Sequence, residues 1–130
     1  MLISFLNAVL KLEKGRKITA IEILDPYQFP RIMGQKASII DVRAKDEKNN
    51  SYIVEMQITE KKGLDKRIQF YSAKGYSNQI GKGDDYLKLR HMIFIGILNF
   101  KYLKVKNYLS RHMIMDCETH EQKLNYIVTF

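Results

Sequence analysis

The chain has 130 residues, of which 45% are hydrophobic and 28% are charged, a composition typical of one globular domain. No apolar run approaches the roughly 20 residues that a transmembrane helix needs, and the first residues lack the basic leader and cleavage site of a signal peptide. The single cysteine, Cys117, excludes an internal disulfide. We therefore expect one domain, residues 1–130, in the cytoplasm and without a membrane partner.

The net charge of +8 is concentrated in the middle of the chain. Residues 61–111 hold 12 basic and 3 acidic side chains, whereas residues 1–60 are nearly neutral and residues 112–130 are acidic. Concentrated positive charge attracts polyanions such as nucleic acids. A solvated lysine-rich surface explains the same charge equally well.

Apolar spacing predicts two helices. Residues 2–13 repeat apolar side chains every three to four positions, and Gly15 is expected to end that helix. Residues 63–80 predict a second, longer helix with apolar side chains on more than one side, closed by Gly81 and Gly83.

Strands are predicted from alternating or continuous apolar runs. The run at 91–98 is almost entirely apolar, which indicates a central strand buried on both faces. Both prolines lie at 26–36, which we interpret as a loop. The expected strands cover residues 17–24, 37–45, 51–59, 91–98, 111–117 and 123–130. The order helix, three strands, helix, three strands predicts an α/β fold with a mixed sheet.

Two carboxylates lie in the middle of neighbouring predicted strands. Because side chains alternate along a strand, Glu55 shares a face with Ile53 and Gln57, and Asp41 shares a face with Arg43. The opposite face of the second strand is expected to be a core stripe, formed by Tyr52, Val54, Met56 and Ile58. A carboxylate among hydrophobic neighbours is costly to bury without compensation.

The predicted turn at 46–50 would place Asp41 directly opposite Glu55, with Cβ atoms about 4.5–5.5 Å apart. Two like charges at that distance repel and raise one pKa. A divalent cation removes the conflict, and Mg²⁺ commonly takes one or two carboxylates. Alternatively, each acid pairs with a cation such as Arg43 or Lys45, and spacing alone favours this second interpretation.

Four segments together resemble the PD-(D/E)xK nuclease family transposases, a group related to Rpn-type recombination-promoting nucleases. They are GRKITAIEILDP, KASIIDVRAKDEKNNSYIVEMQ, KRIQFYSAKGYSNQIGKGDDYLKL and HMIFIGILNF, and the resemblance runs from Leu2 to Phe130. It implies a restriction-endonuclease-like core, a mixed central sheet flanked by helices. It also implies a transposase- and recombination-associated DNA endonuclease, a hydrolase that depends on Mg²⁺, with Mn²⁺ able to substitute.

The resemblance carries roles to particular residues. Asp41 and Glu55 match the acids that bind the metal, and Met56 occupies the x position, whose backbone carbonyl often adds a ligand. Gln57 stands where the superfamily has a catalytic lysine, so it can position the attacking water only by hydrogen bonds. Lys74, on the second predicted helix, is a candidate replacement for that lysine.

Contacts with the DNA backbone are expected on Lys61, Lys62, Lys66, Arg67 and Lys74. Gln69 and Tyr76 share a helical face that would support the site, although simple packing explains them equally well. The chain ends in an uncovered apolar strand and lacks an upstream family segment, so we expect truncation at both ends. Two alternatives follow: a catalytically inactive nucleic-acid-binding remnant, or a self-associating module whose homodimer seals the terminal strand.

Overall fold

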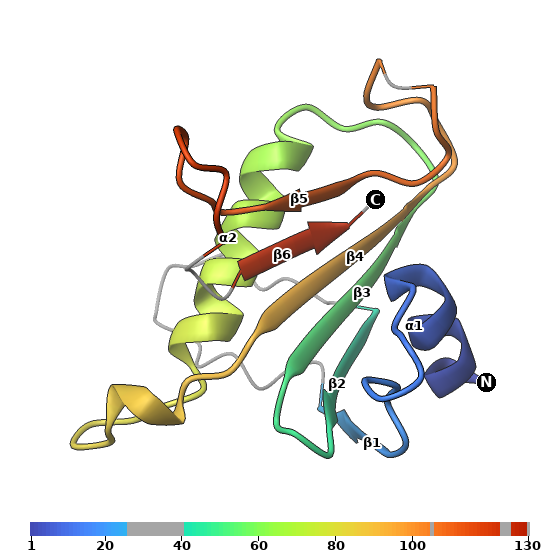
Figure 1. Ribbon diagram of the computed structural model, residues 1–130. Coiled ribbons are helices and arrows are strands. Elements are labelled where there is room, and N and C mark those ends of the chain that lie inside the picture. Colours follow the sequence, from blue (N-terminus) through green and yellow to red (C-terminus); the bar gives the residue numbers. More distant parts are fainter. Residues whose placement is uncertain (26–40, 105, 123–125, 130) are drawn as a thin grey trace.

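The computed structural model describes residues 1–25, 41–104 and 106–122, together with the backbone of 126–129. Among these residues the strands form one six-stranded sheet, in the order β1-β2-β3-β4-β6-β5. The elements along the chain are α1 (Leu2–Leu10), β1 (Ile21–Leu24), β2 (Val42–Asp46), β3 (Ser51–Gln57), α2 (Leu64–Ser77), a 3-10 helix η1 (Tyr86–Lys88), β4 (Met92–Leu98), β5 (Arg111–Met113) and β6 (Tyr126–Thr129) (Figure 1).

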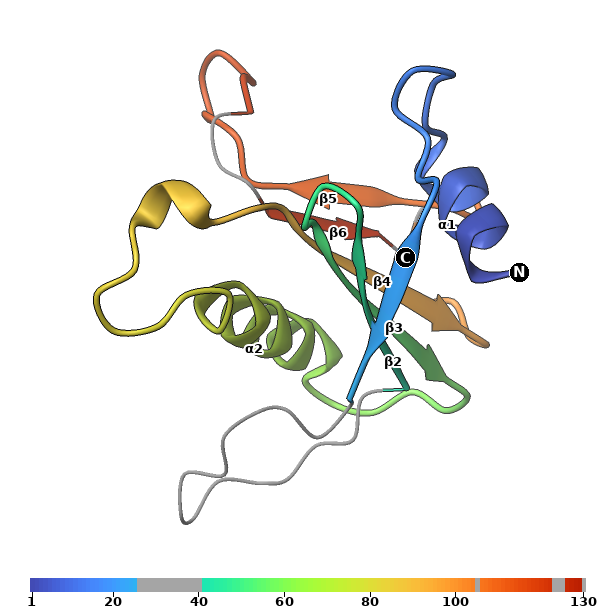
Figure 2. The same cartoon turned by 90° about the horizontal axis from the view of Figure 1, so that it is seen from below.

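The sheet is mixed and lies between the two α-helices. β3 and β4 are parallel, as are β4 and β6, whereas the remaining neighbours are antiparallel. Figure 2 shows α1 and α2 on opposite sides of the sheet. The prediction of an α/β fold with a mixed sheet flanked by helices is therefore confirmed.

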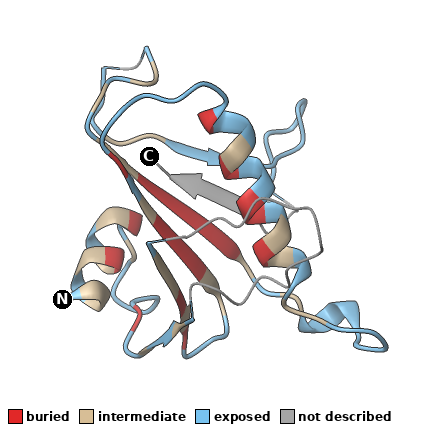
Figure 3. Ribbon diagram, turned by 180° about the vertical axis from the view of Figure 1, so that it is seen from behind, coloured by how far each residue is buried: buried red, intermediate tan, exposed pale blue. Residues whose placement is uncertain are grey.

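Each face of the sheet has its own apolar cluster. The cluster beneath α2 consists of Ile53, Leu64, Ile68, Tyr71, Met92 and Phe94. The cluster beneath α1 consists of Leu6, Leu10, Ile18, Ala44, Tyr52, Val54, Ile93 and Ile95. β4 contributes to both clusters, so the prediction of a central strand buried on both faces is confirmed (Figure 3).

The first helix is shorter than predicted. It ends at Lys11, which adopts a left-handed conformation with φ 51°, rather than at Gly15. The side chain of Asn7 then binds both backbone groups of Ile18, accepting from its N–H at 2.8 Å and donating to its carbonyl at 2.9 Å. These bonds tie the segment before Ile21 to α1, which is why β1 covers only the end of the predicted strand 17–24.

The core stripe predicted along β3 is correct for Tyr52 and Val54 and wrong for two later residues. Met56 and Ile58 are exposed, because the cluster beneath α1 reaches Val54 and does not include them. β3 itself ends at Gln57 instead of residue 59.

The second helix is also shorter than predicted, and the apolar side chains are buried on only one side of it. It ends at Ser77, before either expected glycine, and Phe70 and Ala73 are exposed. η1 was not predicted; Asp85 begins it by accepting from the Leu87 N–H at 2.9 Å.

One further strand is shorter than predicted, and some predictions fall on residues that the structure does not describe. The strand predicted over 111–117 is three residues long, since Asp116 accepts from the N–H groups of Glu118 and Thr119 in a turn. The predicted loop 26–36, residues 37–40 of the next strand and residues 123–125 lie outside the described residues.

Candidate functional site

The β2–β3 hairpin has its register set by one buried carboxylate, that of Asp46. It accepts from the N–H groups of Lys48 and Asn50, from the Asn50 side chain and from the Tyr52 hydroxyl, at 2.7–3.0 Å. Burial and the neighbouring Asp46 charge raise the pKa of Tyr52, so its hydroxyl remains a donor. The resulting register pairs Val42 with Val54.

This register faces Asp41 toward Glu55, as the turn position predicted. Asp41 immediately precedes β2, is exposed, and accepts a 2.7 Å hydrogen bond from the Met56 backbone N–H. Glu55 lies on the α2 side of β3, between Ile53 and Gln57, and its side chain is 12% exposed. Two carboxylates from neighbouring segments thus meet near the carboxyl end of β3.

Arg67, in the first turns of α2, completes the cluster. Its Nη2 donates to a Glu55 carboxylate oxygen, in an ion pair, and to the Gln57 side-chain oxygen at 2.7 Å. The Gln57 amide nitrogen donates to the Thr59 carbonyl at 2.9 Å, so both ends of this buried amide are engaged. The second Glu55 oxygen, Oε2, is buried and has no hydrogen-bond partner within residues 1–25, 41–104 and 106–122.

The electrostatic state of Glu55 reflects these neighbours. Burial raises the pKa of Glu55, the charge of Arg67 opposes that rise, and the charge of Asp41 adds to it. Lys61, in the loop between β3 and α2, also lowers the pKa of Glu55, which places its charge near the carboxylates. Asp41, Glu55 and Arg67 together carry a net charge of −1 when all three are ionised, and the nearby Lys61 offsets part of it.

The other basic residues named from the sequence lie around the cluster. Lys61 and Lys62, in the connection before α2, and Lys66, in its first turn, are exposed, and the charge of Lys61 acts on Glu55. Arg67 was also predicted to contact DNA. Its side chain is instead half-buried in the cluster itself. Lys74 lies two turns further along α2, with its ammonium 5.7 Å from the centre of the Phe70 ring.

The two candidate support residues have different surroundings. Gln69 is exposed, whereas Tyr76 is half-buried and packs against the apolar cluster beneath α2. The structure therefore brings together Asp41, Glu55, Gln57 and Arg67, and it places Lys74 and Tyr76 further along the helix.

Comparison with known proteins identifies the family. A family model described as PD-(D/E)XK nuclease family transposase matches residues 1–129. The chain belongs to the PD-(D/E)XK nuclease family transposases. No curated protein and no solved structure shows a significant match. The chain is thus a nuclease-like, transposase-associated domain, in agreement with the resemblance found in its sequence.

PD-(D/E)XK nucleases generally use divalent metals, and the cluster of this family member fits such an ion. The buried Glu55 Oε2 accepts no hydrogen bond from the part of the chain that the structure describes, and Mg²⁺ prefers oxygen ligands. The side chain of Met56 is exposed on the opposite face of β3, so a contribution from this residue would have to come from its backbone. No group of three or more His, Cys, Asp or Glu suited to a metal occurs among the described residues, so water or substrate oxygens would supply the other ligands.

No helix in the described part of this PD-(D/E)XK protein is long and apolar enough to cross a membrane. The cytoplasmic location and the homodimer stay predictions from the sequence.

Proposed function

We propose that this domain hydrolyses phosphodiester bonds of DNA with Mg²⁺, for which Mn²⁺ can substitute, held by Asp41 and Glu55. One observation carries the proposal: two carboxylates from neighbouring segments converge beside an arginine, at a buried carboxylate oxygen that has no hydrogen-bond partner among the described residues. Structural ion pairs seldom leave such an oxygen unsatisfied, because an unpaired buried polar group is costly.

The bound ion would activate water for attack on phosphorus and neutralise charge on the phosphate. Asp41 and Glu55 orient that ion through their oxygens, and Asp41 is itself oriented by the Met56 N–H. Met56 offers its backbone carbonyl as a further ligand in this proposal.

In this proposal Arg67 supplies the positive charge near the scissile phosphate that the motif lysine supplies elsewhere in the superfamily. A guanidinium has five donors and keeps its charge, so it can hold Glu55 and a non-bridging phosphate oxygen at once. Gln57 is a positioning residue, because its side-chain oxygen holds Arg67 and its amide nitrogen is bound to Thr59. We assign to Arg67, instead of Lys74, the compensation for glutamine at position 57.

The exposed lysines at the start of α2 suit contacts with the DNA backbone that do not depend on sequence. Lys61, Lys62 and Lys66 are exposed close in sequence to Arg67, so that phosphates of a strand bound at the carboxylate cluster could reach them. Affinity that depends on such contacts falls steeply as salt is raised.

A plasmid-nicking assay with and without Mg²⁺ tests the proposal. Nicking should require Mg²⁺ or Mn²⁺ and should disappear in Asp41→Ala and in Glu55→Ala. Glu22→Ala removes an exposed acid from β1 and is the matched control, expected to nick at the wild-type rate. Nicking that persists in Asp41→Ala would contradict this site, and salt-sensitive DNA binding without any nicking would favour the inactive remnant.

A further inference from the structure

The loop that follows β4, of which the structure describes residues 99–104 and 106–110, begins beside the end of β3, the strand that carries Glu55. The backbone N–H of Asn99 donates to the Gln57 carbonyl at 3.0 Å, and Leu98 pairs with Gln57 in the parallel register. The loop therefore emerges at the end of the sheet where Glu55 and Arg67 meet (Figure 1).

The charge of this loop has one sign. Lys101, Lys104 and Lys106 are exposed, and the sequence holds no Asp or Glu between Asp85 and Asp116. Such a segment attracts a polyanion, such as a chain of phosphates, and repels basic partners.

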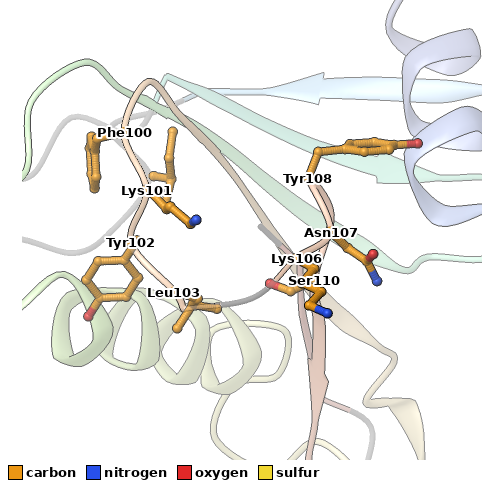
Figure 4. Close-up of a pocket in the computed structure, with 9 residues that line it drawn as sticks. Phe100, Lys101, Tyr102, Leu103, Lys106, Asn107, Tyr108 and Ser110 are labelled. Carbon is orange, nitrogen blue, oxygen red and sulfur yellow. The ribbon is translucent and has the colours of Figure 1, made fainter.

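Two limbs of the loop enclose a hollow of about 320 Å³. Figure 4 shows Phe100, Lys101, Tyr102 and Leu103 on one limb, with the Lys101 ammonium directed into the space between the limbs. Phe100 and Tyr102 pack edge to face, with centroids 6.4 Å apart, and anchor that limb on the apolar cluster beneath α2. The hollow is thus built on a fixed wall and presents an ammonium group.

Tyr108 lies on the second limb, and its ring is directed away from the first (Figure 4). It is 95% exposed, so the faces of its ring are open to solvent. Aromatic rings presented beside lysines bind nucleic acids by stacking on bases while the lysines hold the phosphates.

We infer that the loop 99–110 binds an unpaired DNA strand, with a base stacked on Tyr108 and a phosphate held by Lys101 in the hollow. In a duplex both faces of each base are covered by its neighbours, so an exposed ring can stack only on a base that has left the helix. This inference rests on the proposed function for DNA as the substrate and adds that the strand is single-stranded next to the cleavage site.

The test is fluorescence anisotropy with a labelled 12-nucleotide thymidine strand, measured in EDTA so that no cleavage occurs. A 12-unit abasic deoxyribose-phosphate chain carries the same charge without bases. We expect the thymidine strand to bind more tightly than the abasic chain, and Tyr108→Ala to weaken its binding about 5- to 140-fold. Tyr108→Phe keeps the ring and should bind like wild type.

Tyr86→Ala is the matched control, because Tyr86 is also exposed, at 79%, but lies in η1, at the other end of α2 (Figure 1). Lys101→Ala should reduce the salt dependence of binding by about 0.7 in the logarithmic slope. Equal binding of the two probes, no binding of either, or equal affinities of Tyr108→Ala and Tyr86→Ala would overturn the inference. The binding assay contains no divalent cation and is therefore independent of cleavage. If the protein nicks plasmid but does not bind the thymidine strand as expected, only this inference is refuted. If it binds the strand as expected but does not nick plasmid, only the catalytic proposal is refuted.

Discussion

Arg67→Met separates the structural and the catalytic parts of the candidate site. Arg67 bonds to both Glu55 and Gln57, and its guanidinium carbon lies over the Tyr71 ring, 5.8 Å from the ring centroid. Methionine keeps much of the apolar stem and removes the charge and the donors. The substitution therefore leaves Glu55 beside Asp41 without its ion-pair partner.

The expected loss of stability follows from this contact. A hydrogen bond to a charged group contributes about 1.5–3 kcal/mol, and breaking a fully buried ion pair costs about 3–5 kcal/mol. Because the Arg67 side chain is 29% exposed, the lower range applies. With about 3–5 °C per kcal/mol for a chain of this size, Tm should fall by about 5–15 °C in metal-free buffer.

Mg²⁺ should then stabilise the variant more than the wild type. In the wild type the ion gains part of its attraction from carboxylates that Arg67 already compensates, whereas in Arg67→Met it meets two uncompensated charges. The Mg²⁺-induced rise in Tm should be larger in the variant, by up to the same ~1.5–3 kcal/mol. Thermal denaturation with EDTA and with Mg²⁺ measures this difference.

Nicking should change in the opposite direction. Removing one donor that stabilises developing charge in a transition state costs about 10²–10³ in rate. Arg67→Met should therefore nick about 10²- to 10³-fold more slowly although it gains more stability from Mg²⁺. Arg16→Met, at an exposed arginine outside the cluster, is the control and should change neither quantity.

The reasoning is refuted if Mg²⁺ raises the Tm of wild type and Arg67→Met equally, since the guanidinium and the ion would then not share the same carboxylates. Nicking at the wild-type rate by Arg67→Met would separately remove Arg67 from the reaction.

Two further predictions concern pH and the hairpin. Burial raises the pKa of Glu55, so the metal-free protein should lose stability as pH rises through that raised pKa and Glu55 ionises. Mg²⁺ needs the ionised carboxylate. Its stabilising effect should therefore disappear as pH falls through the same raised pKa, at a pH above the ordinary glutamate range. Tm measured across pH with and without Mg²⁺ tests this, and a loss of the Mg²⁺ effect only at or below the ordinary glutamate range contradicts it. Asp46→Ala removes the acceptor of four hydrogen bonds and should lower the free energy of unfolding by about 2–4 kcal/mol in urea, whereas Lys48→Ala, at an exposed turn residue, should leave it unchanged. A loss below about 0.5 kcal/mol in Asp46→Ala would show that the hairpin does not depend on this carboxylate.

The hairpin could be predicted from sequence because strand geometry is local. A polar turn between two apolar runs fixes which residues face each other, and the expected pairing of Asp41 with Glu55 agrees with the observed register. The ends of the helices could not be predicted, because distant contacts decide them. α1 ends where Lys11 adopts a left-handed conformation, and Asn7 then holds Ile18, a partner eleven residues away.

The position of Arg67 depends on tertiary structure, although the sequence carries a partial signal. Leu64, Ile68 and Tyr71 define the buried stripe of α2, and Arg67 lies three residues after the first and four before the last. Lys74 has the same angular position two turns later, roughly 10 Å along the axis. The short connection from β3 to α2 favours the earlier residue, because it keeps the start of the helix near the end of the strand that carries Glu55.

The contact between Arg67 and Glu55 changes the role that we infer for Gln57. Judged by the motif alone, Gln57 removes the positive charge that would face the phosphate. In the folded chain a positive charge reaches the same carboxylate from α2, and Gln57 holds it there by a hydrogen bond. A lysine at 57 beside Arg67 would add one more positive charge next to these carboxylates and weaken their attraction for a cation, whereas glutamine adds none. The residue that departs from the superfamily motif therefore holds the arginine of the neighbouring helix on Glu55, and in the proposed function that arginine and a divalent cation would share the same pair of acids.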